Sequence, residues 1–173
     1  MTSLKIPVSN SDHRQGVHDS KLVLVEFGDY QCPYCGEAYW IIKELQNQFQ
    51  DNLQFVFRNF PLTTVHPQAL TAAVTAELAG SSGHFWKAHD ALFENQHALG
   101  MDLYIRILSE LDIDQSDLEQ ALEKNSYNGR ISSDFNGGVR SGVNGTPSFY
   151  INGEFYDGLV DVESMTSALS KFL

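Results

Sequence analysis

The sequence predicts an α/β domain into which a block of helices is inserted. Three features predict it: a βαβ-like unit near the N-terminus, a long helical stretch in the middle, and a hairpin followed by a helix near the C-terminus. A chain of 173 residues with 42% hydrophobic residues is typical of one folded domain. We expect a single domain over 1–173, with its core at 1–62 and about 126–173 and the helical insertion at about 66–125.

Two strands are predicted before residue 28. Residues 4–8 alternate between apolar and polar side chains, but Pro7 lacks the N–H that a central strand donates, so we expect an edge strand there. Residues 21–27, KLVLVEF, are nearly all apolar or β-branched. Such a run is typical of a strand that is buried on both faces of its sheet.

A helix and a second buried strand follow. Pro33 lies where the first turn of a helix tolerates proline, and apolar side chains recur at helical spacing as far as Phe49. Residues 53–60 alternate in part and end before Pro61. Because a helix connects this strand to the strand at 21–27, we expect the two strands to pair in parallel.

The helical period then extends from residue 67 to about residue 125, in segments separated by glycines. Residues 130–143 are a weaker helical candidate, because Gly137 and Gly138 each cost roughly 1 kcal/mol relative to alanine in a helix interior. Residues 148–156 predict a hairpin around the turn Asn152-Gly153. A helix at 162–172 completes the predicted fold.

The charge of the chain limits its partners. It has 22 acidic and 11 basic residues, a formal net charge of −11, which disfavours nucleic acids and anionic membranes. The first twenty residues lack the apolar core of a secretory signal, and no uncharged apolar stretch reaches membrane-spanning length. We expect a cytoplasmic protein, with a monomer favoured; an exported protein is the alternative if a signal peptide has been removed.

The chain has two cysteines, Cys32 and Cys35, both within DYQCPYCG. Cys32 lies between a predicted strand and a predicted helix, and the N–H groups at a helix start stabilise a thiolate. We therefore expect Cys32, with its sulfur partly exposed, to attack a substrate disulfide. Cys35, one turn further along and pointing inward, would then resolve the mixed disulfide.

A zinc site and a pair of inert helix residues are the other interpretations of these cysteines. Zinc takes four ligands, a second C-x-x-C is absent, and of the six histidines we consider His84 and His89, which have a metal-like spacing. Those two lie on different faces of one predicted helix. We expect neither a metal nor a bound cofactor, while glutathione is a possible reductant.

Two motifs together carry a family resemblance: VEFGDYQCPYCG and, much later, GVNGTPSFYING. They resemble the DsbA-like branch of the thioredoxin superfamily, and the likeness covers nearly the whole chain. The resemblance implies a thioredoxin fold interrupted by a helical domain. It also implies that Cys32 attacks, that Cys35 resolves, and that Pro147 is a cis-proline facing both cysteines.

Thr146-Pro147 and Glu26 also have readings of their own. Only X-Pro bonds adopt the cis form at modest cost, and a cis bond here would expose the Thr146 backbone to a substrate strand; an ordinary turn is the alternative. Glu26 is the sole charge within VLVEFG, and burial would raise its pKa, so that its carboxyl would shuttle the proton of Cys35. A glutamate that reaches solvent from the strand end is the other reading. Similar family members carry an acid at the matching place.

The dipeptide between the cysteines, Pro33-Tyr34, departs from the Pro-His of the best-known DsbA pattern and resembles glutaredoxins. Tyrosine supplies no positive charge to hold Cys32 as a thiolate, so strong oxidising power is not expected. We predict a reduction potential on the order of −180 to −230 mV. At that potential the protein would rest mostly reduced in the cytoplasm and act as a reductase or disulfide-exchange enzyme.

The predicted function is that of a thiol–disulfide oxidoreductase, which exchanges disulfides with protein or small-molecule thiols through Cys32 and Cys35. Substrate would contact Pro33, Tyr34 and the pair Thr146-Pro147. Two alternatives remain. One is a glutathione-dependent transferase or isomerase of the kappa type, which does not need the second cysteine. The other is a non-catalytic module that captures extended peptides beside Pro147.

Overall fold

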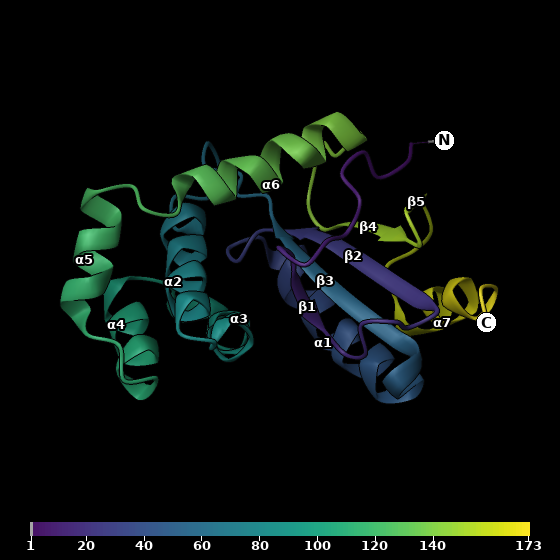
Figure 1. Cartoon of the computed structure of the whole chain (residues 1–173), viewed down its shortest axis with the longest axis horizontal. Helices are drawn as coiled ribbons and strands as arrows, with labels where there is room; N and C mark the ends of the chain where they lie inside the picture. The colour runs from purple at the N-terminus through teal and green to yellow at the C-terminus, as the bar shows by residue number, and fades with distance from the viewer. Residues whose placement is uncertain (1) are drawn as a thin grey trace.

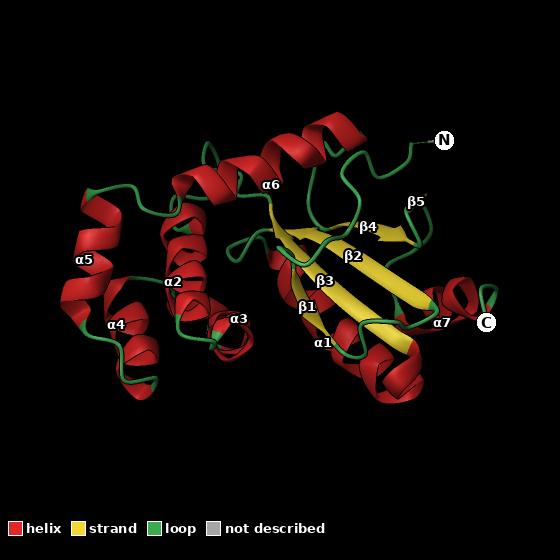
Figure 2. Ribbon diagram, in the orientation of Figure 1, coloured by secondary structure: helices red, strands yellow, loops and turns green. Residues whose placement is uncertain are grey.

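The computed structural model describes residues 2–173, which form a five-stranded mixed sheet and seven α-helices (Figures 1 and 2). The strands, in the spatial order β1-β3-β2-β4-β5, are β1 (His13–Gln15), β2 (Leu22–Gly28), β3 (Leu53–Asn59), β4 (Ser148–Ile151) and β5 (Glu154–Tyr156). The helices are α1 (Pro33–Phe49), α2 (Ala69–Ser81), α3 (Phe85–Glu94), α4 (Met101–Glu110), α5 (Gln115–Glu123), α6 (Asn128–Ser141) and α7 (Val162–Ser170).

The two predicted buried strands form the centre of the sheet. β2 pairs in parallel with β3 along its whole length and antiparallel with β4 on its other side. Every residue of β3 is buried, and so are six of the seven residues of β2. The βαβ unit formed by β2, α1 and β3, with its parallel pairing, is therefore confirmed.

The predicted edge strand at 4–8 is wrong, because the edge is formed by β1, which pairs antiparallel with β3. The backbone at 4–8 finds other partners. The N–H of Leu4 donates to the carbonyl of Gly153 at 2.9 Å, and the guanidinium of Arg58 donates to the carbonyls of Ile6 at 2.8 Å and Pro7 at 3.2 Å. Leu4 and Val8 pack on an apolar face of the sheet, which accounts for the alternation.

α6 crosses that same apolar face of the sheet in Figure 1. It continues through Gly137 and Gly138, the pair that weakened its prediction. A Cβ atom on Gly138 would lie 2.9 Å from ring atoms of Phe27 and of Phe60. Glycine therefore allows the helix to lie close against the sheet, and this packing offsets its low helix propensity.

The turn between β4 and β5 has the predicted hairpin geometry. Asn152 and Gly153 both have positive φ angles, 49° and 86°, which a two-residue turn of this kind requires. The side chain of Asn152 also accepts a hydrogen bond from the N–H of Val23 at 2.8 Å, which ties the turn to β2.

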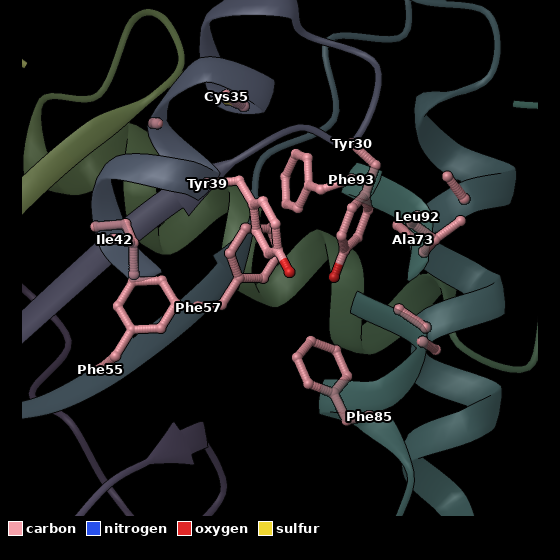
Figure 3. Packing of buried hydrophobic residues seen from close by; sticks show 14 of the residues in the cluster. Tyr30, Cys35, Tyr39, Ile42, Phe55, Phe57, Ala73, Phe85, Leu92 and Phe93 are labelled. Carbon is pink, nitrogen blue, oxygen red and sulfur yellow. The ribbon is translucent and has the colours of Figure 1, made fainter. Parts of the chain in front are cut away.

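Helices α2 to α5 form a block beside the sheet, seen at the left of Figure 1. Its junction with the sheet is aromatic: the ring of Tyr30 lies 4.9 Å from that of Phe93 and 5.1 Å from that of Phe57. Figure 3 shows these rings grouped with Tyr39 below Cys35. The helical block therefore packs directly against the segment that carries the cysteines. We keep the division into a core and an insertion at about 66–125 as a proposal.

Candidate active site

The two cysteines lie at the start of α1. Cys32 is the N-cap residue, with an extended backbone, and Pro33 takes the first helical position, as expected. Both cysteines are free. Cys32 is only 4% exposed and Cys35 is 0% exposed, so the sulfur of Cys32 is less open than the sequence suggested.

The surroundings of the two sulfurs give them opposite acidities. The pKa of Cys32 is lowered to about 5, chiefly by a hydrogen bond from the thiol of Cys35, with further contributions from Thr146 and from backbone N–H groups of α1; burial opposes the shift. The pKa of Cys35 is raised well above its usual value, first by burial and then by its bond to Cys32. Cys32 is thus a thiolate at neutral pH, while Cys35 is a thiol.

Thr146 and Pro147 lie against Cys32. The peptide bond between them is cis, and Cys32 Sγ lies 3.5 Å from the carbonyl oxygen of Thr146. The hydroxyl of Thr146 is buried and has no hydrogen-bond partner within residues 2–173. Because β4 begins at the next residue and pairs with β2, the sheet itself brings this segment to the cysteines.

Glu26 is a buried carboxyl in the middle of the sheet. It lies on β2 between Phe57 of β3 and Phe149 of β4, and it is 2% exposed. Its Oε1 has no hydrogen-bond partner in the described part of the chain. Burial, followed by the negative charge of Cys32, raises its pKa to about 8. The expected rise is confirmed, and the reading of Glu26 as a solvent-reaching glutamate is wrong.

A groove of about 220 Å³ opens at the Thr146-Pro147 segment, where Thr146 contacts Cys32. Its lining residues come from α1, from the Thr146-Pro147 segment and from the loop before α7: Tyr34, Glu37, Ala38, Ile41, Thr146, Pro147 and Val160. Tyr34 is 69% exposed at its rim. Of the four residues predicted to contact substrate, three line this groove, whereas Pro33 is exposed at the helix start and is not among the lining residues.

Sequence reasoning missed the residues that hold the cysteine loop. Asp29 is a buried carboxyl that accepts hydrogen bonds from the loop backbone. Gln96 Nε2 donates to the carbonyls of Tyr30 at 2.9 Å and Cys32 at 2.8 Å. Asp29 lies within the cysteine motif, where its charge beside a buried strand was the available signal. Gln96 has no such signal, since it is 64 residues from Cys32.

The histidines considered as zinc ligands lie elsewhere. His84 is the N-cap residue of α3, and His89 is buried with its Nδ1 3.0 Å from the hydroxyl of Tyr30. Residues 2–173 contain no group of three histidine, cysteine or acidic side chains placed to hold a metal ion. Within the same residues, no helix combines the length and apolarity needed to cross a membrane.

Comparisons with known sequences give one family. Residues 9–171 match the model of a family described as thioredoxin. Curated relatives include the Na(+)/H(+) antiporter NhaA 1 of Salinispora arenicola, 37% identical over 168 residues and 96% of this chain, and NhaA of Herminiimonas arsenicoxydans, 34% identical over 158 residues and 91% of this chain. The chain spans only about a quarter of these relatives, 26% and 25% of their lengths.

Solved structures share the fold over nearly the whole chain. BdbD from Bacillus subtilis has a TM-score of 0.87 at 22% identity, with 99% of this chain and 97% of that one covered. A thioredoxin-like oxidoreductase from Silicibacter pomeroyi has a TM-score of 0.81 at 25% identity, covering 94% and 92%. Wolbachia pipientis alpha-DsbA1 has a TM-score of 0.82 at 18% identity, covering 98% and 94%.

Proposed function

Because the chain belongs to the thioredoxin family and has the fold of DsbA-type thiol–disulfide oxidoreductases, we propose that it exchanges disulfides with protein or small-molecule thiols through Cys32 and Cys35. The observation that carries this proposal is the opposed acidity of the two sulfurs, whose pKa values are lowered at Cys32 and raised at Cys35. One sulfur is a nucleophile at neutral pH, and its neighbour keeps a proton until it is needed.

The exchange takes two steps. The thiolate of Cys32 attacks one sulfur of a substrate disulfide, the substrate S–S bond breaks, and the released substrate sulfur takes a proton. Cys35 then loses its proton and attacks Cys32 Sγ, which releases the second substrate thiol and leaves a Cys32–Cys35 disulfide. The substrate gains two electrons and the protein loses two. Oxidation of a substrate dithiol runs the same steps backwards.

We propose that the carboxylate of Glu26 accepts the proton that Cys35 loses in the second step. The carboxyl of Glu26 is buried on β2, the strand that leads to the cysteine loop, and its charge raises the pKa of Cys35. Its Oε1 lies close to Gly28, the last residue of β2. The N–H of the next residue, Asp29, contacts Cys35 Sγ at 3.5 Å. With a pKa of about 8, Glu26 both holds and releases a proton near neutral pH, which is the property a general base needs.

The groove beside Cys32 is the proposed substrate site. Its lining is mainly apolar and includes Ile41, Pro147 and Val160, with Glu37 as its one acidic residue. A groove of this shape accommodates an extended peptide whose apolar side chain enters the pocket. Tyr34, Thr146 and Pro147 are the proposed contacts, with Pro33 at the entrance.

The pKa of Cys32 indicates whether the protein tends to reduce or to oxidise its substrates. A pKa of about 5 lies between the values of about 7 in thioredoxin and about 3.5 in DsbA. The corresponding potentials are about −270 and −120 mV, so the potential proposed for this chain is roughly −180 mV. In the cytoplasm such a couple rests mostly reduced, and glutathione is a suitable reductant. In an oxidising compartment poised near −180 mV, about half of the protein would hold the disulfide and could donate it.

We do not propose ion antiport as a function of this chain. The antiporter names belong to proteins of which this chain spans about a quarter, 26% for the relative from Salinispora arenicola. Within this chain, residues 9–171 match the thioredoxin family, and the chemistry at Cys32 is that of a thiol.

Trapping of mixed disulfides tests the proposal. Cys35→Ser should accumulate covalent complexes with a model disulfide substrate through Cys32, and Cys32→Ser should form none. Full glutathione-dependent turnover by Cys35→Ser would instead favour the kappa-type transferase or isomerase. If the unaltered protein neither reduces nor oxidises any model disulfide, the peptide-binding module is the better description.

A further inference from the structure

A buried carboxylate beside the cysteines has no part in the exchange steps. The side chain of Asp29 is 0% exposed. Its Oδ1 accepts hydrogen bonds from the N–H groups of Gln31 at 2.8 Å and Cys32 at 3.2 Å. Its Oδ2 accepts from the N–H of Leu62 at 2.9 Å and from Nδ1 of His66 at 2.8 Å. A carboxylate has about four acceptor sites, so all of them are used.

Asp29 contacts both Cys32 and Cys35. Through Oδ1 it fixes the peptide N–H of Cys32, the N-cap residue of α1. Through its own peptide N–H it contacts Cys35 Sγ at 3.5 Å. The side chain of Asp29 therefore helps to orient the turn between β2 and α1, together with Gln96, which donates to the carbonyls of Tyr30 and Cys32.

The two groups that donate to Oδ2 of Asp29 lie in the segment at 60–68, which connects β3 with the helical block. A carboxylate only accepts hydrogen bonds, so Nδ1 of His66 must be the donor. A second bond joins the same two segments, since the N–H of Gln68 donates to Oε1 of Gln31 at 2.6 Å. His66 is the accessible member of the pair, with 19% of its side chain exposed.

We propose that Asp29 and His66 are positioning residues for disulfide exchange. His66 holds the carboxylate of Asp29, and Asp29 holds the turn that aims the first N–H groups of α1 at Cys32 Sγ. The inference rests on the proposed function of the cysteine pair for its biological meaning. The reactivity of Cys32 thus depends on His66, a residue that acts through Asp29 and makes no hydrogen bond to the sulfur.

The test compares alkylation of Cys32 by iodoacetamide in the reduced protein at one fixed pH below the Cys32 pKa of about 5, where the rate is proportional to the thiolate fraction. The glutathione equilibrium is a second readout. His66→Ala should slow alkylation by about tenfold, since a hydrogen bond to a charged group typically contributes about that factor. His66→Asn should restore most of the rate, because its amide nitrogen can take the place of Nδ1. A purely structural role would not change the equilibrium with glutathione.

The chain offers a matched control. Nε2 of His13 lies 2.9 Å from the carboxylate of Glu77, with exposed side-chain fractions of 15% and 3% against 19% and 0% for His66 and Asp29. Neither His13 nor Glu77 contacts the cysteine loop through a hydrogen bond of the described structure. His13→Ala should therefore lower thermal stability while leaving alkylation of Cys32 unchanged.

Equal rates of Cys32 alkylation in folded His66→Ala and in the unaltered protein would overturn the inference, as would equal losses in His66→Ala and His13→Ala. If His66→Ala does not fold, His66→Gln, which moves the donor along the side chain, takes its place with the same expected loss. Alkylation needs no substrate. A reactive Cys32 that depends on His66, in a protein that exchanges no disulfide, would refute the proposed function alone.

Discussion

Cys32 and Thr146, 114 residues apart in the chain, meet where Cys32 Sγ lies 3.5 Å from the carbonyl oxygen of Thr146. The side chain of Thr146 contributes to the lowered pKa of Cys32, and its buried hydroxyl has no other hydrogen-bond partner within residues 2–173. A buried hydroxyl beside a thiolate has an obvious acceptor in that sulfur. The residue before β4 therefore helps to set the chemistry at the start of α1.

Thr146→Val should raise the pKa of Cys32 above about 5, because the variant keeps the shape of the side chain and loses its hydroxyl. The thiolate absorbance in the ultraviolet, followed against pH, gives this pKa directly. Thr146→Ser keeps the hydroxyl and serves as the control. An unchanged titration in Thr146→Val would show that the hydroxyl plays no part.

Labelling should distinguish the two cysteines of the reduced protein. Since the thiolate forms above the pKa, Cys32 should alkylate at half its maximal rate near pH 5, and its labelling should slow as the pH falls further. Cys35, whose pKa is raised by burial and by Cys32, should stay unlabelled throughout this range. Mass spectrometry of digested protein locates the label. Equal labelling of both cysteines would contradict the assigned roles.

Glu26→Gln should slow resolution of the mixed disulfide more than its formation. The amide cannot take the proton of Cys35, whereas the attack of Cys32 needs no base at neutral pH, because its pKa is about 5. Loss of a general base typically costs about 100-fold or more in the step it serves. Stopped-flow measurements of the two steps provide the comparison. If both rates are unchanged, Glu26 has only a structural role.

Gly138→Ala should destabilise the protein by roughly 1–3 kcal/mol, because the new methyl group would press on buried rings. A Cβ atom there would lie 2.9 Å from atoms of Phe27 and Phe60. Gly129, also in α6, has nothing within 4 Å of such an atom. Gly129→Ala is therefore the control, with a gain of up to about 1 kcal/mol from helix propensity. Urea denaturation of both variants gives the two values, and equal values would remove the packing explanation.

The central elements of this fold could be predicted because their signals are local. The apolar run of β2, Pro33 at the start of α1 and the Asn152-Gly153 turn each identify an element by their own residues. The edge strand could not be predicted in this way. Residues 4–8 do not form it, and Arg58, from a distant part of the chain, donates hydrogen bonds to the carbonyls of Ile6 and Pro7.

The residues of the site likewise divide into those that local sequence identifies and those that it does not. A spacing of three residues at a helix start identifies Cys32 and Cys35, and an isolated charge in a buried strand identifies Glu26. The support for the loop could not be predicted, because Gln96 reaches Cys32 only through the packing of the helical block. The hydrogen bond between His66 and Asp29 likewise spans 37 positions that no local pattern connects.

Equilibration with defined mixtures of reduced and oxidised glutathione tests the central claim most directly. The fraction of protein with a Cys32–Cys35 disulfide, measured after acid quenching and alkylation, should follow a single two-electron transition with a potential of roughly −180 mV. A potential near −120 mV would make the protein a strong oxidant that donates disulfides. Failure to form the intramolecular disulfide at any glutathione ratio would contradict the account.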